Sequence, residues 1–275
     1  DGNTNSSGSD IFLVKYNSSG TKQWTKQLGT SSDDRGNGVT TDSSGNIYVT
    51  GYTDRSGNEN IILVKYNSSG TNLWTKQLGT SSDDWGNGVT TDSSGNIYVT
   101  GITERGLDGN TSSGNDDIFL VKYNSSGTKQ WTKQLGTSSS DGGSGVTTDS
   151  SGNVYVTGYT LGGLDGNTNS GSYDMFLVKY NSSGTKQWTK QLGSSGWDWG
   201  NGVTTDSSGN IYVTGYTNGG LDGNTNSGYG DIFLVKYNSS GTKQWTKQLG
   251  TSSNDEGSGV TTDSSGNFYV TGYTN

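Results

Sequence analysis

The chain has 275 residues, of which 25% are hydrophobic, and it carries a net charge of −8. Nucleic-acid-binding proteins usually show a basic patch, whereas the lysines here are scattered, so no nucleic acid is expected as a partner. There is no run of about 18 apolar residues, so no insertion into a membrane is predicted.

A repeated segment, LVKYNSSGT, dominates the sequence. It starts at Leu13, Leu63, Leu120, Leu177 and Leu234. A mean hydropathy of −0.76 would by itself favour disorder. Apolar and aromatic residues nevertheless return at fixed places in every copy, and repeats of this length are typical of solenoids and propellers.

Each copy is predicted to form four β-strands, shown here for the second copy of the repeat. Residues 38–42 (GVTTD) are β-prone and end in a turn. Residues 46–52 (NIYVTGY) alternate β-branched and aromatic side chains. After a variable connection, residues 61–66 (IILVKY) and 71–78 (TNLWTKQL) flank a tight turn at 67–70. No apolar stripe of helical period is present, so no helix is predicted.

Four strands per repeat match one propeller blade, and we label them A to D. One tryptophan in strand D of each copy is expected to pack between neighbouring blades. These residues are Trp24, Trp74, Trp131, Trp188 and Trp245.

The pattern GVTTDSSGNIYVTGYT…DIFLVKYNSSGTKQWTKQLG resembles the SBBP family of bacterial β-propeller repeats, and its strand order is similar to that of NHL blades. The resemblance covers essentially the whole chain and implies an all-β propeller of four-stranded antiparallel blades. The family is usually described as seven-bladed. The five copies counted here predict five blades instead.

The two ends of the chain are predicted to share one blade within a single domain, 1–275. Residues 10–29 would supply strands C and D, and residues 258–274 strands A and B. The expected blades are 258–275 plus 1–30, then 36–80, 86–136, 143–193 and 200–250. A monomer is expected, and the alternative is a segment cut from a longer ring or array.

Four of the B–C loops carry oxygen side chains at alternate positions, with glycine nearby and a later aspartate. This pattern resembles calcium loops, because Ca²⁺ prefers six to eight oxygen ligands. The alternative is an ordinary turn rich in Gly, Asn and Ser. The fifth loop, 54–60, lacks the motif. The candidate ligands are Asp1, Asn3, Asn5, Asp10; Asp108, Asn110, Ser112, Asp117; Asp165, Asn167, Asn169, Asp174; and Asp222, Asn224, Asn226, Asp231.

The D–A loops vary most between copies and carry Trp85, Trp197 and Trp199, with Asp84 and Asp198 beside them. A flat indole next to an acid is suited to stacking on a pyranose. These five residues are therefore the candidate ligand-binding site. The alternative is that the aromatic rings pack over the loop.

The sequence predicts a non-catalytic binding or display scaffold, calcium-stabilised and without an organic cofactor, in a secreted or surface-exposed bacterial protein. Its expected partner is an unidentified surface molecule or a glycan. A multivalent lectin is the alternative. A hydrolase is less favoured, because the chain has no histidine for a Ser-His-Asp triad. Near-identical copies also fit recent amplification or design, in which case no evolved ligand need exist.

Overall fold

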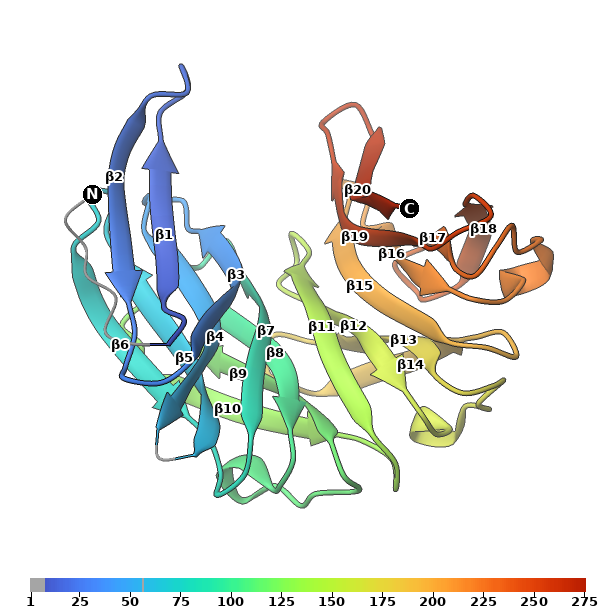
Figure 1. Ribbon diagram of the computed structural model, residues 1–275, viewed down its shortest axis with the longest axis horizontal. Coiled ribbons are helices and arrows are strands. Elements are labelled where there is room, and N and C mark those ends of the chain that lie inside the picture. The colour runs from blue at the N-terminus through green and yellow to red at the C-terminus, as the bar shows by residue number, and fades with distance from the viewer. Residues whose placement is uncertain (1–7, 56) are drawn as a thin grey trace.

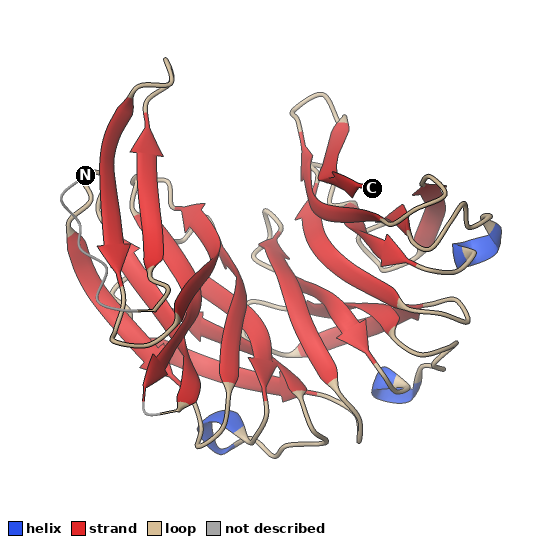
Figure 2. Ribbon diagram, in the orientation of Figure 1, coloured by secondary structure: helices blue, strands red, loops and turns tan. Residues whose placement is uncertain are grey.

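The computed structural model describes residues 8–55 and 57–275, which form a series of antiparallel sheets around a common centre (Figures 1 and 2). Four sheets have four strands and two have two strands. The strands are β1 (Ile11–Tyr16), β2 (Lys22–Leu28), β3 (Asp34–Thr41), β4 (Ile47–Arg55), β5 (Asn58–Tyr66), β6 (Asn72–Leu78), β7 (Asp84–Thr91), β8 (Ile97–Thr103), β9 (Asp117–Tyr123), β10 (Lys129–Leu135), β11 (Asp141–Thr148), β12 (Val154–Thr160), β13 (Asp174–Tyr180), β14 (Lys186–Leu192), β15 (Asp198–Thr205), β16 (Ile211–Thr217), β17 (Asp231–Tyr237), β18 (Lys243–Leu249), β19 (Asp255–Thr262) and β20 (Phe268–Thr274).

Each four-stranded sheet is one blade whose strands A to D pair in chain order, as in β3–β4–β5–β6. Strand A is longer than predicted, because it starts at Asp34 rather than at residue 38. The carboxylate of Asp34 is buried and accepts hydrogen bonds from the backbone N–H and hydroxyl of Thr30. The glycines between Asp34 and Val39 hide this extension from a pattern search, and the register shifts between Gly36 and Gly38.

The hydrophobic core lies between adjacent blades, so each blade needs its neighbour to bury its apolar face. One junction combines Tyr98, Ile118 and Leu120 with Val154, Val156, Phe176 and Val178 of the next blade. Trp131 packs against this cluster, with its ring centroid 6.0 Å from that of Tyr98. A Cβ on Gly184, in a turn of the next blade, would lie 3.0 Å from the Trp131 ring, so this turn covers the indole closely. Trp131 therefore lies between blades as expected, although it is half-buried.

A buried polar residue begins strand C and explains the glycine that ends strand D. Asp117 accepts hydrogen bonds from the Ser113 N–H at 2.7 Å and the Gln134 amide at 2.7 Å. A Cβ on Gly136 would lie 1.9 Å from Asp117 Oδ1. No side chain therefore fits at Gly136 unless Asp117 moves.

The A–B turns repeat one hydrogen-bonded motif. In the third complete blade, Asp149 accepts hydrogen bonds from the backbone N–H groups of Ser151 and Asn153, each at 2.9 Å. Its other oxygen accepts from Tyr155 Oη at 2.9 Å. Burial by itself would raise the pKa of Asp149, but these hydrogen bonds hold it below its ordinary value. The same motif recurs at Asp206.

The sequence missed three single turns of 3₁₀ helix in the B–C loops: η1 (Leu107–Gly109), η2 (Leu164–Gly166) and η3 (Leu221–Gly223). Each buries its leucine completely and places its aspartate in the left-handed backbone region, at φ 53° for Asp108. A three-residue turn has no helical period, so a search for apolar stripes does not detect it. None of the helices in the described part of the chain is long and apolar enough to cross a membrane.

The series of blades is open at its ends, and Figure 1 shows β1–β2 facing β19–β20 across the opening. Among the described residues, these two half-blades are separate sheets, and no strand pairs with the outer edge of β1 or of β20. Ring closure by a shared blade therefore stays a prediction.

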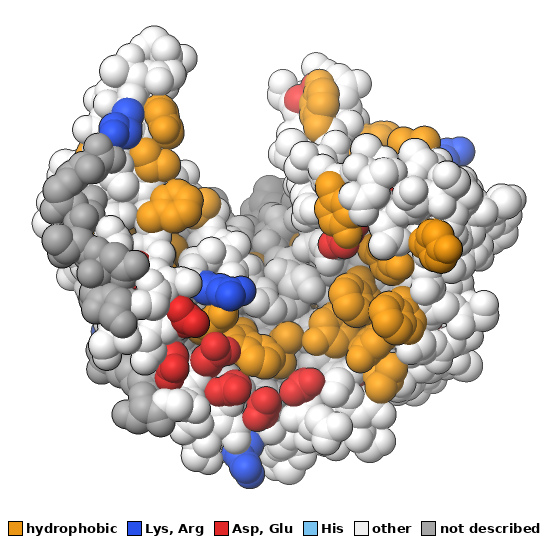
Figure 3. All heavy atoms as spheres, viewed as in Figure 1, with side chains coloured by type: hydrophobic (Ala, Val, Ile, Leu, Met, Phe, Trp, Pro, Cys, Tyr) orange, Lys and Arg blue, Asp and Glu red, His pale blue; other side chains and the backbone are white. Residues whose placement is uncertain are grey.

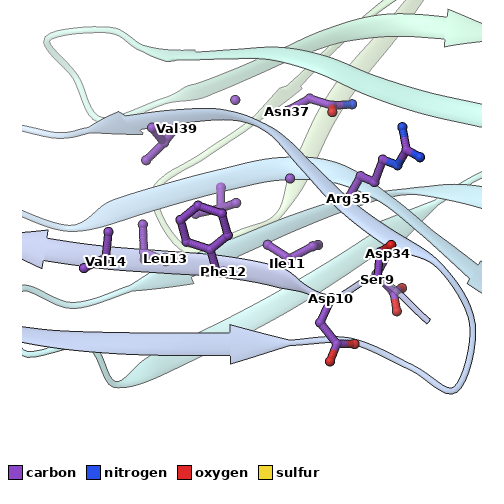
Figure 4. A pocket seen from close by; sticks show the side chains of 13 residues that line it. Ser9, Asp10, Ile11, Phe12, Leu13, Val14, Asp34, Arg35, Asn37 and Val39 are labelled. Atoms are coloured by element: carbon purple, nitrogen blue, oxygen red, sulfur yellow. The ribbon is translucent and has the colours of Figure 1, made fainter. Parts of the chain in front are cut away.

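A groove of about 470 Å³ runs between β1 and β3 at this opening (Figure 4). It is lined by apolar side chains, including Ile11, Phe12, Leu13 and Val39. Phe12 is 72% exposed and Val39 is 62% exposed. Such exposure of large apolar side chains contrasts with the buried core of the complete blades.

Candidate functional site

Three of the positions that differ between copies lie at the same end of each blade, on one face of the propeller. They are the second residue of strand A, its partner on strand B, and the residue before the buried polar residue of strand C. We call this set the variable face. It consists of Arg35, Trp85, Gly142, Trp199, Glu256; Tyr52, Ile102, Tyr159, Tyr216, Tyr273; and Ser9, Glu59, Asp116, Tyr173, Gly230. By contrast, the turns DSSGN and NSSGT are the same in every copy.

Backbone hydrogen bonds join the variable positions of one blade to those of the next. The N–H of Asp141 donates to the Asp116 carbonyl at 2.9 Å, and the N–H of Asp198 donates to the Tyr173 carbonyl at 2.7 Å. The residue before strand C therefore lies beside the start of the following strand A. Side chains of two blades meet at each junction, so each junction is a separate candidate binding surface.

Five aromatic side chains gather at the junction of the third and fourth complete blades. Trp197 and Trp199 are stacked, with ring centroids 6.2 Å apart and an interplanar angle of 3°. Tyr159 and Tyr173 each lie 5.6 Å from Trp199, and Tyr216 lies 6.4 Å from it. We call these five residues the aromatic cluster. Trp197 is 46% exposed, which leaves part of its indole open to a ligand.

Trp85 occupies the position equivalent to Trp199 two blades earlier, but its surroundings differ. Its indole N–H donates a hydrogen bond to the carboxylate of Glu59. Tyr173 takes the place of Glu59 beside Trp199, and the buried Trp199 Nε1 has no hydrogen-bond partner among the described residues. An unsatisfied buried donor costs about 1–3 kcal/mol.

Acidic side chains gather on the same face, beside apolar ones (Figure 3). The carboxylates of Asp83 and Asp116 lie close enough to Glu104 to act on it. Burial raises the pKa of Glu104, and the charges of Asp83 and Asp116 raise it further. Burial and Asp116 likewise raise the pKa of Tyr159 to about 12.

The sequence-predicted ligand residues are only partly brought together. Trp197 and Trp199 stack, whereas Trp85 lies in another blade. Asp84 and Asp198 are both fully buried, and Asp84 accepts hydrogen bonds from the N–H and hydroxyl of Thr80. Burial raises the pKa of both carboxyls. Their oxygens hold the D–A loop and are not at the surface where a ligand would bind.

Tyr159, Tyr173 and Tyr216 are members of the candidate site that sequence reasoning missed. Tyr159 and Tyr216 lie in strand B, where an aromatic residue is typical of a core strand. Comparison of the copies could have identified Tyr173, because its equivalents are Ser9, Glu59, Asp116 and Gly230.

In the predicted calcium loops, the candidate ligand side chains each contact a different group of the protein. Asp108 forms an ion pair with Lys129 and accepts a hydrogen bond from Thr132. Asn110 donates its amide to the Leu107 carbonyl at 2.7 Å, and Asp117 is buried. The other two loops repeat the ion pair, as Lys186–Asp165 and Lys243–Asp222. Asp1, Asn3 and Asn5 lie outside the described residues.

Within the described ranges, no three acidic, histidine or cysteine side chains form a group that could hold a metal ion. The first candidate ligand of each described loop is instead paired with a lysine. Calcium binding stays a prediction, and it requires Lys186 to leave Asp165 and the loop to close around the ion.

A calcium titration tests that prediction. With affinities of about 10⁻⁴–10⁻³ M for such modules, calcium at about 10 mM should raise the melting temperature reversibly. Asp165→Ala should remove one loop's share of this shift, and Lys186→Ala should increase the affinity by freeing Asp165. If neither heat nor thermal shift accompanies the addition of calcium, these loops are ordinary turns.

Two curated relatives share part of the chain. An uncharacterised WD repeat-containing protein, L264, of Acanthamoeba polyphaga mimivirus is 30% identical over 168 residues. The regulatory protein FlaEY of Caulobacter vibrioides is 28% identical over 169 residues. The matches cover 51% and 56% of this chain, but only 12% and 18% of those proteins. This chain is therefore similar to a small part of each.

Similar solved structures share little sequence with this chain. A protein of unknown function from Bacteroides caccae is 11% identical, with 84% of this chain and 87% of the other covered and a TM-score of 0.34. A luciferin-regenerating enzyme is 14% identical, with 86% and 69% covered and a TM-score of 0.43.

The family model of the SBBP β-propeller repeat matches five segments, at residues 23–57, 73–103, 130–165, 187–222 and 244–275. These segments fall at the same phase of each repeat and together span more than half of the chain. They cover strands A and B of each copy together with the preceding strand D. The chain belongs to the SBBP β-propeller repeat family.

Proposed function

We propose that this protein is a non-catalytic binding scaffold that takes a glycan at the aromatic cluster. The observation that carries the proposal is the half-exposed Trp197 stacked on Trp199, at a place where the scaffold otherwise repeats. An indole face offers a large apolar surface to a pyranose ring, and the tyrosine hydroxyls nearby can bond to sugar hydroxyls. Loops on a rigid scaffold commonly carry binding residues.

The arrangement of the paired acids supports binding over hydrolysis. Asp84 is buried, and its neighbour Asp83 accepts a hydrogen bond from the Glu59 N–H at 2.9 Å. An acid–base pair has to present both carboxylates to one scissile bond. Asp83 and Asp84 instead accept hydrogen bonds from different residues, Glu59 and Thr80. A secreted or surface location, as expected for a glycan-binding scaffold, remains part of the proposal.

Glycan-array binding by the intact protein tests the proposal. Trp197→Ala should lower the affinity for a bound glycan at least tenfold, which corresponds to about 1.4 kcal/mol, because it removes the exposed stacking surface. Trp24→Ala, in strand D of a half-blade, is the control, since it removes an indole far along the chain. Equal binding by Trp197→Ala and the parent protein would contradict a glycan site at this cluster.

We further propose that β20 pairs with β1 and closes a five-bladed ring. In the complete blades, strand B pairs with strand C in one register, with Val49 opposite Val64 and Val213 opposite Val235. The same register would place Val270 opposite Val14. Pairing removes two exposed strand edges, which are sites of aggregation in other proteins.

A second observation supports closure. One contact recurs at all the remaining junctions between blades, and the residues that would make it at the opening do not meet there. A Cβ on the turn glycine Gly70 or Gly184 would lie 3.0 Å from the tryptophan of the preceding blade, whereas nothing lies within 4 Å of a Cβ on Gly20. Closure would bring Gly20 against Trp245. It would also cover Phe12 and Val39 in the groove of Figure 4. A disulfide between cysteines at positions 14 and 270 tests this closure.

A further inference from the structure

Negative charge borders the aromatic cluster on two sides. On one side, the Asp116 carbonyl accepts a hydrogen bond from the Asp141 N–H at 2.9 Å, and the next residue, Gly142, is paired with Tyr159. Burial and the charge of Asp116 raise the pKa of Tyr159.

On the other side of the cluster, the Glu256 carboxylate accepts hydrogen bonds from Tyr273 Oη at 3.0 Å and from the Asn201 amide at 2.9 Å. After the effect of burial, the charge of Glu256 raises the pKa of Tyr216. These acids come from different strands and loops, and both are half-buried.

Few positive charges neutralise this border. In the described part of the chain, the ion pairs are Lys129–Asp108, Lys186–Asp165 and Lys243–Asp222, all in the B–C loops. Arg105 follows Glu104 but donates its Nε–H to the Ser82 hydroxyl at 2.6 Å. The raised pKa of Glu104 reflects burial and the neighbouring charges of Asp83 and Asp116. A cation bound at this place would relieve that repulsion.

The faces of the aromatic rings also favour a positively charged ligand. The π-system of tryptophan or tyrosine attracts a cation within about 6 Å of the ring centroid. The chain already uses this interaction elsewhere, since Lys122 Nζ lies 5.3 Å from the centroid of the Tyr98 ring. At the aromatic cluster, rings and carboxylates therefore select together for a positively charged ligand.

We infer that the ligand is a glycan with free amino groups, a polymer of glucosamine units in which the amines are not acetylated. The pyranose rings stack on Trp197, and the ammonium groups approach Asp116 and Glu256. This inference rests on the proposed function, because it names the class of glycan that the same site takes.

Binding of three soluble ligands to the full chain tests the inference. We compare glucosamine oligomers, N-acetylglucosamine oligomers of equal length, and an oligolysine peptide, by calorimetry below the pKa of the sugar amine. The expected result is at least tenfold tighter binding of the glucosamine oligomers than of the acetylated ones. The preference should disappear at about 1 M salt, where the screening length is about 3 Å.

Charge-neutral variants of similar size separate the two parts of the site. Asp116→Asn with Glu256→Gln should abolish the preference for the free amine. Trp197→Ala should weaken both glycans. Asp108→Asn is the control. It removes one negative charge from the loop that also carries Asp116, but this charge belongs to the ion pair with Lys129. The preference for the free amine should therefore stay unchanged.

The outcomes distinguish this inference from the proposed function. Equal affinity for both glycans would overturn the free-amine inference and leave the glycan site standing. Binding of oligolysine without either glycan would overturn the free-amine inference, and together with a glycan array that shows no binding it would indicate a basic peptide as the ligand. Binding of none of the three would overturn the free-amine inference and leave the glycan site to the array test.

Discussion

A protein carrying Val14→Cys and Val270→Cys should form an intramolecular disulfide and gain about 5 kcal/mol in free energy of unfolding. The register of the complete blades would place these two residues opposite each other on β1 and β20. Directly opposed residues on antiparallel strands lie within the Cα separation that a disulfide requires. Because the bond would close a loop of about 250 residues, the loss of entropy in the unfolded chain is large. The native chain has no cysteine, so no other pairing competes.

A matched pair inside a complete blade provides the control. Val49→Cys with Val64→Cys lies on β4 and β5 in the same register and should also form a disulfide. Its loop is about 15 residues, so the expected gain is only about 3 kcal/mol. Urea unfolding with and without reductant measures both gains. If the control disulfide forms but the Val14–Val270 pair stays reduced, or crosslinks two chains, the proposed closure is wrong.

The repeated strands were predictable because each position carries the same constraint in five copies. The segment LVKY indicated strand C, and the turns at 43–45 and 67–70 separate the strands as expected. The start of strand A was not predictable from side-chain alternation, because glycines precede Val39. The buried carboxylate of Asp34 fixes that start, and burial of an acid is not visible in a sequence.

Only part of the candidate site was predictable. Trp197 and Trp199 were found because they break the repeat. Tyr159 and Tyr216 look like core strand residues, and only the pairing of β11 with β12 and of β15 with β16 places them on the variable face. Asp198, although adjacent to a site tryptophan, points inward because strand side chains alternate between opposite faces.

Trp131→Ala should lower the free energy of unfolding by about 3 kcal/mol. Truncating a packed tryptophan costs roughly 3–5 kcal/mol. The lower end applies because Trp131 is half-buried, and its buried Nε1 has no hydrogen-bond partner among the described residues. Urea unfolding followed by circular dichroism measures the loss. A loss below about 1 kcal/mol would mean that Trp131 does not hold two blades together.

The equivalent substitution Trp245→Ala then measures whether the ring is closed. Trp131 is covered by the Gly184 turn of the next blade, whereas Trp245 contacts Phe268, at 5.6 Å between ring centroids, and Tyr212. In a closed ring the Gly20 turn covers Trp245, and both substitutions should cost the same, about 3 kcal/mol. In an open chain Trp245 loses that cover, so Trp245→Ala should cost clearly less than Trp131→Ala. Equal losses, together with the Val14–Val270 disulfide, would establish that the fifth blade is built from both ends of the chain.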